Sequence, residues 1–298
     1  MSAWAAERAS GMSSTSARRH GRVFDGVAAE YDRSRPTYPG ELVDRACRVA
    51  GLRSGDRVLE IGCGTGQLTR DLLARGLRVT AVEPGKSLRA LAEENLGGLG
   101  QVEFVDARFE DAALPRGHFR AVFSASAFHW LDPEVSWQKA ARVLAGGGTL
   151  VLLEYCGLEE ERSRRDLDEL MAILARTAPE VAAEWPRYRD LAAIVAGVAQ
   201  RRENVSEVWA WIGSHDVAQS CAGRQFSDVQ LATVPTLLEQ TAGEISSLLR
   251  TASFYARLSP GQRLGLERET AELYERLGRP IRSSTVAVLV TARRAASI

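Results

Sequence analysis

A glycine-rich loop directly after a short apolar run is the segment of this chain best suited to holding a ligand. Residues 58–66 read Val-Leu-Glu-Ile-Gly-Cys-Gly-Thr-Gly, which places glycines at Gly62, Gly64 and Gly66. Glycine is needed where the backbone takes a positive φ or lies against a ligand without a Cβ in the way. A helix expected from Gln67 would offer unpaired N–H groups and the positive end of its dipole. The spacing is G-x-G-x-G, and Gln67 stands where a dinucleotide fingerprint has its third glycine.

Acidic residues lie at the ends of three successive apolar runs. Glu60 would repel a diphosphate but would favour a ligand with an ammonium group and a sulfonium, the charges of the methionine part of S-adenosylmethionine. Glu83 stands where a carboxylate can accept hydrogen bonds from two ribose hydroxyls. Asp106 and Ala107 stand where an adenine amino group could be bound. These residues therefore favour S-adenosylmethionine over a nicotinamide dinucleotide.

Short apolar, β-branched runs that alternate with helical segments must position these residues. Runs of this kind predict strands buried on both faces of a parallel sheet, joined by right-handed crossovers. In the first half of the chain, strands are expected at 57–61, 78–83, 101–106, 119–126 and 149–155. Helices are expected at 67–75, 86–95 and 133–144, the last with Pro133 in its first turn and Asp132 as its cap.

The second half of the chain is charge-rich and largely helical. Helical patterning covers 158–175 and 243–278, while strand signals return at 205–212, 226–234 and 285–293. The expected fold is an α/β, Rossmann-like, seven-stranded and mostly parallel sheet with helices on both faces and a largely helical insertion. The expected divisions are a flexible tail at 1–20, a cofactor-binding domain at 21–155, a helical insertion covering the acceptor site at 156–280, and a final strand within 281–298.

The motifs resemble those of class I S-adenosylmethionine-dependent methyltransferases, whose glycine motif matches residues 60–66 and whose ribose-binding and adenine-side acids match Glu83 and Asp106. Within that class the chain is similar to the ubiquinone/menaquinone and trans-aconitate methyltransferase-like group. This similarity is carried by residues 24–32, 35–39 and 127–130, and the match to the class as a whole extends over about half the chain. It implies that the segment before the first strand closes over the cofactor, with Tyr31, Arg35 and Tyr38 at the site.

Residues 124–130, which follow the fourth predicted strand, should face the transferred methyl group, because ligands bind beyond the carboxyl ends of parallel strands. Ser124 is expected to contact the cofactor. A neutral imidazole at His129 could take a proton from a hydroxyl, an amine or an activated carbon. Alternatively, His129 and Trp130 only shape the cofactor's edge, because methyl transfer can proceed through alignment and desolvation alone.

Several residues are expected to line the acceptor cavity. Trp209 and Trp211 lie two apart on an expected strand and would point the same way. Thr251 and Tyr255 match the helical cover of the family, where such side chains reach the substrate. The expected acceptor-binding set is Tyr38, Trp130, Trp209, Trp211, Thr251 and Tyr255.

Composition narrows the range of partners. The 38 basic and 38 acidic residues cancel, so no overall field attracts nucleic acid or an anionic membrane. The four cysteines show no zinc-type spacing, which favours reduced thiols in a cytoplasmic protein without a structural metal. The expected function is methylation of a small metabolite or natural product. A cyclase or rearrangement enzyme using the same cofactor and a non-catalytic binding module stay open, as do the methylated atom and homo-oligomer formation.

Overall fold

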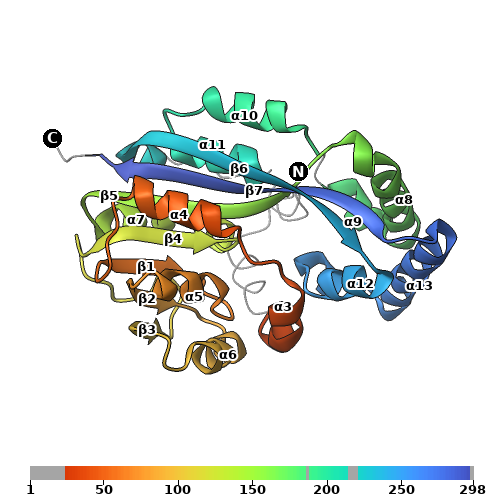
Figure 1. Cartoon of the computed structure of the whole chain (residues 1–298), viewed down its shortest axis with the longest axis horizontal. Helices are drawn as coiled ribbons and strands as arrows, with labels where there is room; N and C mark the ends of the chain where they lie inside the picture. The colour runs from red at the N-terminus through yellow and green to blue at the C-terminus, as the bar shows by residue number, and fades with distance from the viewer. Residues whose placement is uncertain (1–23, 186–187, 214–220, 296–298) are drawn as a thin grey trace.

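A seven-stranded sheet forms the centre of the molecule, in a computed structural model that describes residues 24–185, 188–213 and 221–295 (Figure 1). The strand order is β3-β2-β1-β4-β5-β7-β6. The first five strands run parallel, whereas β7 is antiparallel to both β5 and β6. The strands are β1 (Arg57–Ile61), β2 (Arg78–Val82), β3 (Val102–Val105), β4 (Phe119–Ala125), β5 (Leu144–Gly157), β6 (Phe226–Gln240) and β7 (Ile281–Arg294). The expected Rossmann-like, mostly parallel sheet is confirmed.

The helices of the first half follow the predicted alternation. They are η1 (Phe24–Val27), α3 (Ala28–Ser34), α4 (Gly40–Val49), α5 (Gln67–Ala74), α6 (Lys86–Leu96), η2 (Phe128–Trp130) and α7 (Pro133–Val143). Asp132 caps α7 by accepting a 3.0 Å hydrogen bond from the Glu134 N–H, and Pro133 occupies the first turn, as predicted. The predicted tail at 1–20 lies outside the described residues.

The second half contributes two groups of helices separated by β6. The first group is α8 (Glu161–Thr177), α9 (Pro179–Glu184), α10 (Leu191–Ala199), α11 (Val205–Gly213) and η3 (Cys221–Gln225), and the second is α12 (Ala242–Arg250), η4 (Ser253–Arg257) and α13 (Pro260–Leu277). Helices α8, α9, α12 and α13 gather at one end of the molecule, on the side toward which the arrows of β1 and β4 point (Figure 1). This end is therefore the ligand end of a parallel sheet.

The prediction of a strand at 205–212 is wrong, because this segment forms α11. Asn204 begins the helix by accepting a 3.0 Å hydrogen bond from the Ser206 N–H. Val205, Val208, Trp209 and Ile212 are buried at helical spacing. This apolar stripe outweighs the strand propensity of valine and tryptophan. By contrast, the strand predicted at 226–234 is confirmed as part of the longer β6.

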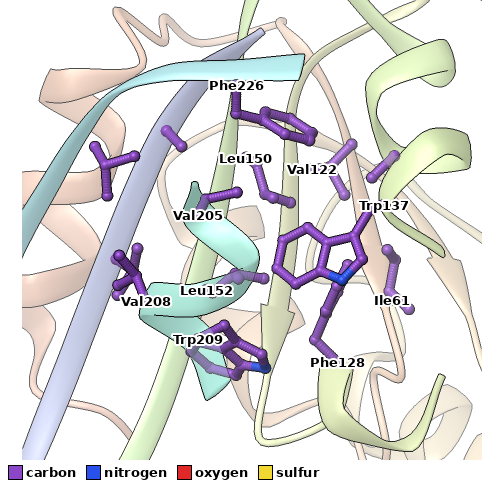
Figure 2. Packing of buried hydrophobic residues seen from close by; sticks show 14 of the residues in the cluster. Ile61, Val122, Phe128, Trp137, Leu150, Leu152, Val205, Val208, Trp209 and Phe226 are labelled. Atoms are coloured by element: carbon purple, nitrogen blue, oxygen red, sulfur yellow. The ribbon is translucent and has the colours of Figure 1, made fainter. Parts of the chain in front are cut away.

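Apolar cores cover both faces of the sheet. Neighbouring residues of a strand alternate between them: on β5, Leu150 and Leu152 face α7, α10 and α11, whereas Val151 and Leu153 face α4, α5 and α6. Figure 2 shows the first of these cores, in which Trp137 and Phe226 pack beside Leu150. A third apolar cluster joins α8, α12 and α13 through residues that include Ile173, Leu174, Leu266 and Leu273. The helical cover at the ligand end therefore has a small core of its own.

No helix in the described part of the chain is both long and apolar enough to cross a membrane.

Candidate functional site

The glycine loop leaves β1 and turns sharply into α5 at the point where the strand order reverses. Gly62, Gly64 and Gly66 all have positive φ, at 69°, 56° and 86°. A Cβ on Gly62 would lie 2.5 Å from the Cβ of Ala127, and one on Gly66 would lie 2.8 Å from Leu96 Cδ1. A Cβ on Gly64 would meet only Tyr31 Cε1, at 4.0 Å. Packing against Ala127 and Leu96 therefore requires glycine at positions 62 and 66. Beside Gly64, by contrast, there is open space.

Glu60 lies beneath this loop rather than on its surface. Its side chain is buried and accepts a 2.7 Å hydrogen bond from Thr69 Oγ1 of α5. Burial raises the pKa of Glu60 to about 7, although the hydrogen bond from Thr69 opposes this rise; the negative charge of Glu83 adds to it. A positive charge bound near the loop would therefore favour the ionised form of Glu60.

Glu83 joins the glycine loop to the end of β2. Its Oε2 accepts a 3.0 Å hydrogen bond from the Gly64 N–H, and its Oε1 accepts one of 2.8 Å from the Gly85 N–H. Burial raises the pKa of Glu83, and these two backbone donors partly offset the rise. An ionised carboxylate has about four lone-pair positions, so Glu83 keeps acceptor capacity for further donors.

Asp106 lies at the exposed rim of the site, beyond β3. Its carboxylate receives two hydrogen bonds of 2.7 Å from Arg89 of α6, and Arg89 also donates to the Glu83 carbonyl at 3.0 Å. Ala107, half-buried, packs beside it against the core. Arg89 therefore ties the ends of β2 and β3 together, a role that the sequence reasoning missed.

The segment before β1 covers the glycine loop from outside. Asp25 accepts hydrogen bonds from the Ser87 and Leu88 N–H groups, at 2.6 Å and 3.2 Å, and so caps α6 from far away in the chain. The ring of Phe24 contacts Tyr31 and Trp130, with centroids 5.7 Å and 5.5 Å apart. This aromatic group reaches the opening at Gly64 through Tyr31.

Arg35 connects this N-terminal segment with the C-terminal helices. Its Nε donates a 3.0 Å hydrogen bond to Thr251 Oγ1, and its Nη2 donates one of 2.6 Å to the Thr251 carbonyl. Arg250 forms further ion pairs with Glu30 of α3 and Glu267 of α13. Two covers from opposite ends of the sequence thus meet at the ligand end of the sheet.

A hydrogen-bonded chain of polar side chains lies where β4 and β5 end. Tyr38 Oη and Ser126 Oγ are 2.7 Å apart, and Ser126 donates to Glu154 Oε1 at 2.8 Å. The other carboxylate oxygen of Glu154 lies 3.1 Å from His129 Nδ1. His129 and Glu154 are nearly buried, with side-chain exposures of 13% and 11%. Tyr155 stacks on Tyr38, with centroids 4.9 Å apart.

Other predicted site residues lie away from these strand ends. Ser124 is fully buried and donates a 3.1 Å hydrogen bond to the Ile61 carbonyl, so its hydroxyl points into the sheet. Trp209 belongs to the core beside Phe128 (Figure 2). Trp211 packs on α10 and has the guanidinium carbons of Arg189 and Arg201 4.2 Å and 4.4 Å from its ring centroid.

The two tryptophans do not point the same way, because residues two apart on a helix lie on opposite sides. Of the residues predicted in the helical cover, Thr251 accepts the two hydrogen bonds from Arg35 described above. Tyr255 donates a 2.6 Å hydrogen bond to Glu267 on α13. The structure thus brings Tyr31, Arg35, Tyr38, Trp130 and Thr251 toward the glycine loop and His129, and leaves Ser124 and Trp211 outside this group.

Glu154 is the main residue that the sequence reasoning missed. It is an acid near the end of the apolar run 149–155, which is the same signal that singled out Glu60 and Glu83. Ser126 lies within the predicted segment 124–130 but was not singled out there. It is one of two residues other than glycine with positive φ in the described segments, at 48°.

Comparison with known proteins gives a consistent result. Residues 59–152 match a family model described as a methyltransferase domain. An uncharacterized methyltransferase of Mycobacterium tuberculosis is 33% identical over 195 residues, which cover 60% of this chain and 76% of that protein. A ubiquinone/menaquinone biosynthesis C-methyltransferase of Pseudomonas syringae is 34% identical over 153 residues, covering 48% and 60%. The YcgJ protein of Bacillus subtilis shares the fold, with a TM-score of 0.51 and 16% identity over 87% of this chain and 100% of its own.

Proposed function

Because the chain belongs to the class I S-adenosylmethionine-dependent methyltransferases, we propose that it methylates a small-molecule acceptor bound where β4 and β5 end. The observation that carries this proposal is the proximity of the two parts of the site. Ala127, whose Cβ would meet a Cβ on Gly62, is two residues from His129. The segment that bears the polar chain therefore packs directly on the cofactor loop.

The residues at the loop fit S-adenosylmethionine. Thr65 Oγ1 is buried in this loop without a hydrogen-bond partner among the described residues, and a ligand atom could satisfy it. Glu83 would bind the ribose hydroxyls, and Asp106 with Ala107 would border the adenine. When bound, S-adenosylmethionine supplies a methyl group carried on a positively charged sulfur.

The charges and rings around the loop suit a cationic ligand. Glu60, Glu83 and Glu154 are acidic, and aromatic faces such as that of Trp130 attract cations, as Tyr31 does with the guanidinium of Arg35 at 5.3 Å from its ring centroid. The same carboxylates would repel the diphosphate of a dinucleotide. The electrostatics therefore support the sulfonium cofactor independently of the family.

We assign His129 as the group that accepts the acceptor's proton. Its ring is nearly buried, lies beside the Trp130 ring with centroids 5.1 Å apart, and is held at the end of β4 by η2. The covers formed by α3 and α12 would exclude water, so that the proton passes to His129 rather than to solvent.

The test is incubation of the purified chain with methyl-labelled S-adenosylmethionine and a panel of phenols, enols, keto acids, carboxylic acids and prenyl compounds. Phenols belong in this panel because one relative is named for quinone biosynthesis. The expected product has gained one methyl group, and its formation should stop in Glu83→Ala. A product of altered structure without the added methyl would indicate a cyclase or rearrangement enzyme.

Calorimetry provides the second arm of the test. S-adenosylmethionine and S-adenosylhomocysteine are expected to bind, whereas a pyridine dinucleotide is not. Binding of the dinucleotide alone would overturn the proposal.

A further inference from the structure

We infer that Glu154 is a positioning residue that holds His129 as a general base, and that the acceptor therefore carries a removable proton on its nucleophilic atom, as a phenol or enol does. The inference rests on the proposed methyl transfer and narrows its substrate class. It excludes acceptors that are already anionic at neutral pH, such as carboxylates, because these need no base.

The His129–Glu154 contact fixes which nitrogen of the imidazole carries the proton. An ionised carboxylate can only accept hydrogen bonds, so the 3.1 Å contact between Glu154 Oε2 and His129 Nδ1 requires the proton on Nδ1. In the neutral ring the lone pair then lies on Nε2. This is the tautomer that can take a proton from an acceptor.

Glu154 is itself held in place by donors on its other oxygen. Ser126 Oγ and the Tyr155 N–H donate to Oε1, at 2.8 Å and 3.1 Å. Because the Ser126 hydroxyl proton points to Glu154, Tyr38 must donate to Ser126 Oγ. Burial, and then the charge of Glu154, raise the pKa of Tyr38 well above its ordinary value, so Tyr38 remains a donor.

The backbone at Ser126 is strained where this chain of hydrogen bonds passes through it. A φ of 48° is unfavourable for a residue with a side chain, and such residues cluster at functional sites. Here it places the hydroxyl between Tyr38 and Glu154.

The surroundings of Glu154 suit the protonated form of His129. Within the described ranges, His129 is the one basic side chain that contacts the Glu154 carboxylate, and no Lys or Arg nitrogen lies within 4.0 Å of it. The imidazolium formed during the reaction would therefore be stabilised by Glu154. In that step the acceptor atom bonds to the methyl carbon, the carbon–sulfur bond breaks with its electron pair left on sulfur, and the acceptor's proton goes to Nε2 of His129.

Glu154→Gln tests the positioning role. A glutamine amide can donate to Nδ1, which would move the ring proton to Nε2 and block the base. We expect kcat to fall by on the order of 10²–10⁴-fold, as for loss of a correctly oriented base, with KM and S-adenosylhomocysteine affinity within about threefold. Glu154→Asp should recover part of the activity.

The tautomer provides a measurement that does not depend on turnover. Nitrogen NMR of the labelled protein should show Nδ1–H for His129 in the native chain and Nε2–H in Glu154→Gln. The chain has four histidines, so the signal is assigned by its loss in His129→Gln. Glu103→Gln, an exposed glutamate on β3, is the matched control and should change neither the tautomer nor kcat.

Three results would overturn the inference. They are an Nε2–H tautomer in the native chain, an unchanged kcat in Glu154→Gln, or a higher kcat/KM for carboxylates than for phenols and enols. The tautomer of the native chain remains decisive even if the variant does not fold. In each case, the proposed function would stand if the chain still binds S-adenosylmethionine and forms a methylated product. If it neither binds the cofactor nor forms that product, the proposed function itself is refuted.

Discussion

Glu60 should make the stability of the free protein depend on pH. Its pKa is raised from 4.5 to about 7 by burial, so the folded state holds a proton that the unfolded state has lost between these values. Stability therefore decreases as pH rises from about 4.5 to about 7, by up to about 3 kcal/mol, and stays lower above that range. The reason is that above pH 7 the folded chain contains a buried negative charge.

Glu60→Gln removes this charge and keeps an oxygen that can accept from Thr69. We expect the variant to gain stability relative to the native chain as pH rises from 5 to 8, by about 1–3 kcal/mol in urea unfolding. Its affinity for S-adenosylmethionine should decrease, because the carboxylate no longer attracts the ligand's positive charge. Glu103→Gln serves as the exposed control. A stability difference that does not vary with pH would contradict the buried-charge interpretation.

Gly62 is predicted to be the least replaceable residue of the loop. Alanine there would have an unfavourable φ of 69° and a Cβ 2.5 Å from that of Ala127. Strain and overpacking together should lower stability by roughly 2 kcal/mol or more, and the displaced loop should lose cofactor binding. Gly146→Ala, which has open space and no positive φ, should behave like the native chain. Equal effects of the two substitutions in thermal unfolding would refute this account.

At the scale of elements, the contact between α3 and α12 should control how fast the site opens. Thr251→Val removes the oxygen that accepts from Arg35 Nε but preserves the shape of the side chain. A hydrogen bond to a charged group contributes about 1.5 kcal/mol or more, so S-adenosylhomocysteine should dissociate roughly tenfold faster in stopped-flow measurements. The substitution also removes the 2.8 Å hydrogen bond that Thr251 Oγ1 donates to the Leu248 carbonyl. Thr177→Val on α8 is the matched control, because it loses the same kind of bond, from Thr177 Oγ1 to the Ile173 carbonyl. A similar acceleration in the control would show that the effect is not specific to this contact.

The cap of α11 gives a second prediction at this scale. Asn204 Oδ1 accepts from both the N–H and the hydroxyl of Ser206. Asn204→Ala should lower the free energy of unfolding by about 1–2 kcal/mol, as measured with urea. Glu203→Ala, at the exposed neighbouring position, should change it little. If both variants unfold alike, the cap does not determine where α11 begins.

The first half of the fold could be predicted because its signals are local. A parallel strand buried on both faces is a continuous apolar run, and the turn after β1 needs glycines that appear in the sequence itself. Helix α11 was missed because Val and Trp favour strands, while its Asn204 cap and its buried stripe from Val205 to Ile212 favour a helix. Where the strand propensity of single residues and the helical spacing of apolar residues disagree, packing against the sheet determines which secondary structure forms.

The site could be predicted only where each residue belongs to a motif. The glycine loop, Glu83 and Asp106 follow strands in order, so the topology alone brings them together. The contacts of Asp25 with α6, of Arg35 with Thr251 and of Glu154 with His129 join segments far apart in sequence. No pattern within a single chain specifies such pairs, and they define the acceptor side.

At the scale of the whole molecule, the cover at the ligand end has an apolar cluster that is distinct from the two cores of the sheet and reaches β7 through Ile281. Its apolar cluster joins α8, α12 and α13, and the buried Asp166 of α8 connects it to β7 by accepting from Arg279 at 2.7 Å and 2.8 Å and from the Arg282 N–H at 2.8 Å. A cover held by such a cluster can open at α12 while it stays anchored to β7. The contacts that restrain it at the site are those with α3.

Binding of S-adenosylhomocysteine should therefore protect a specific subset of elements from hydrogen exchange. We expect slower exchange in α3, in the loop at 62–66 and in α12, because the ligand would hold both covers against the sheet. In α8 and α13 the rates should change little, since their apolar cluster forms without the ligand.

At about 100 times Kd the ligand contributes about 2.7 kcal/mol, which should raise Tm by on the order of 5 °C. A pyridine dinucleotide is the control. Protection confined to the loop, with α12 unchanged, would show that the C-terminal cover closes independently of the cofactor and that Arg35 does not couple the two.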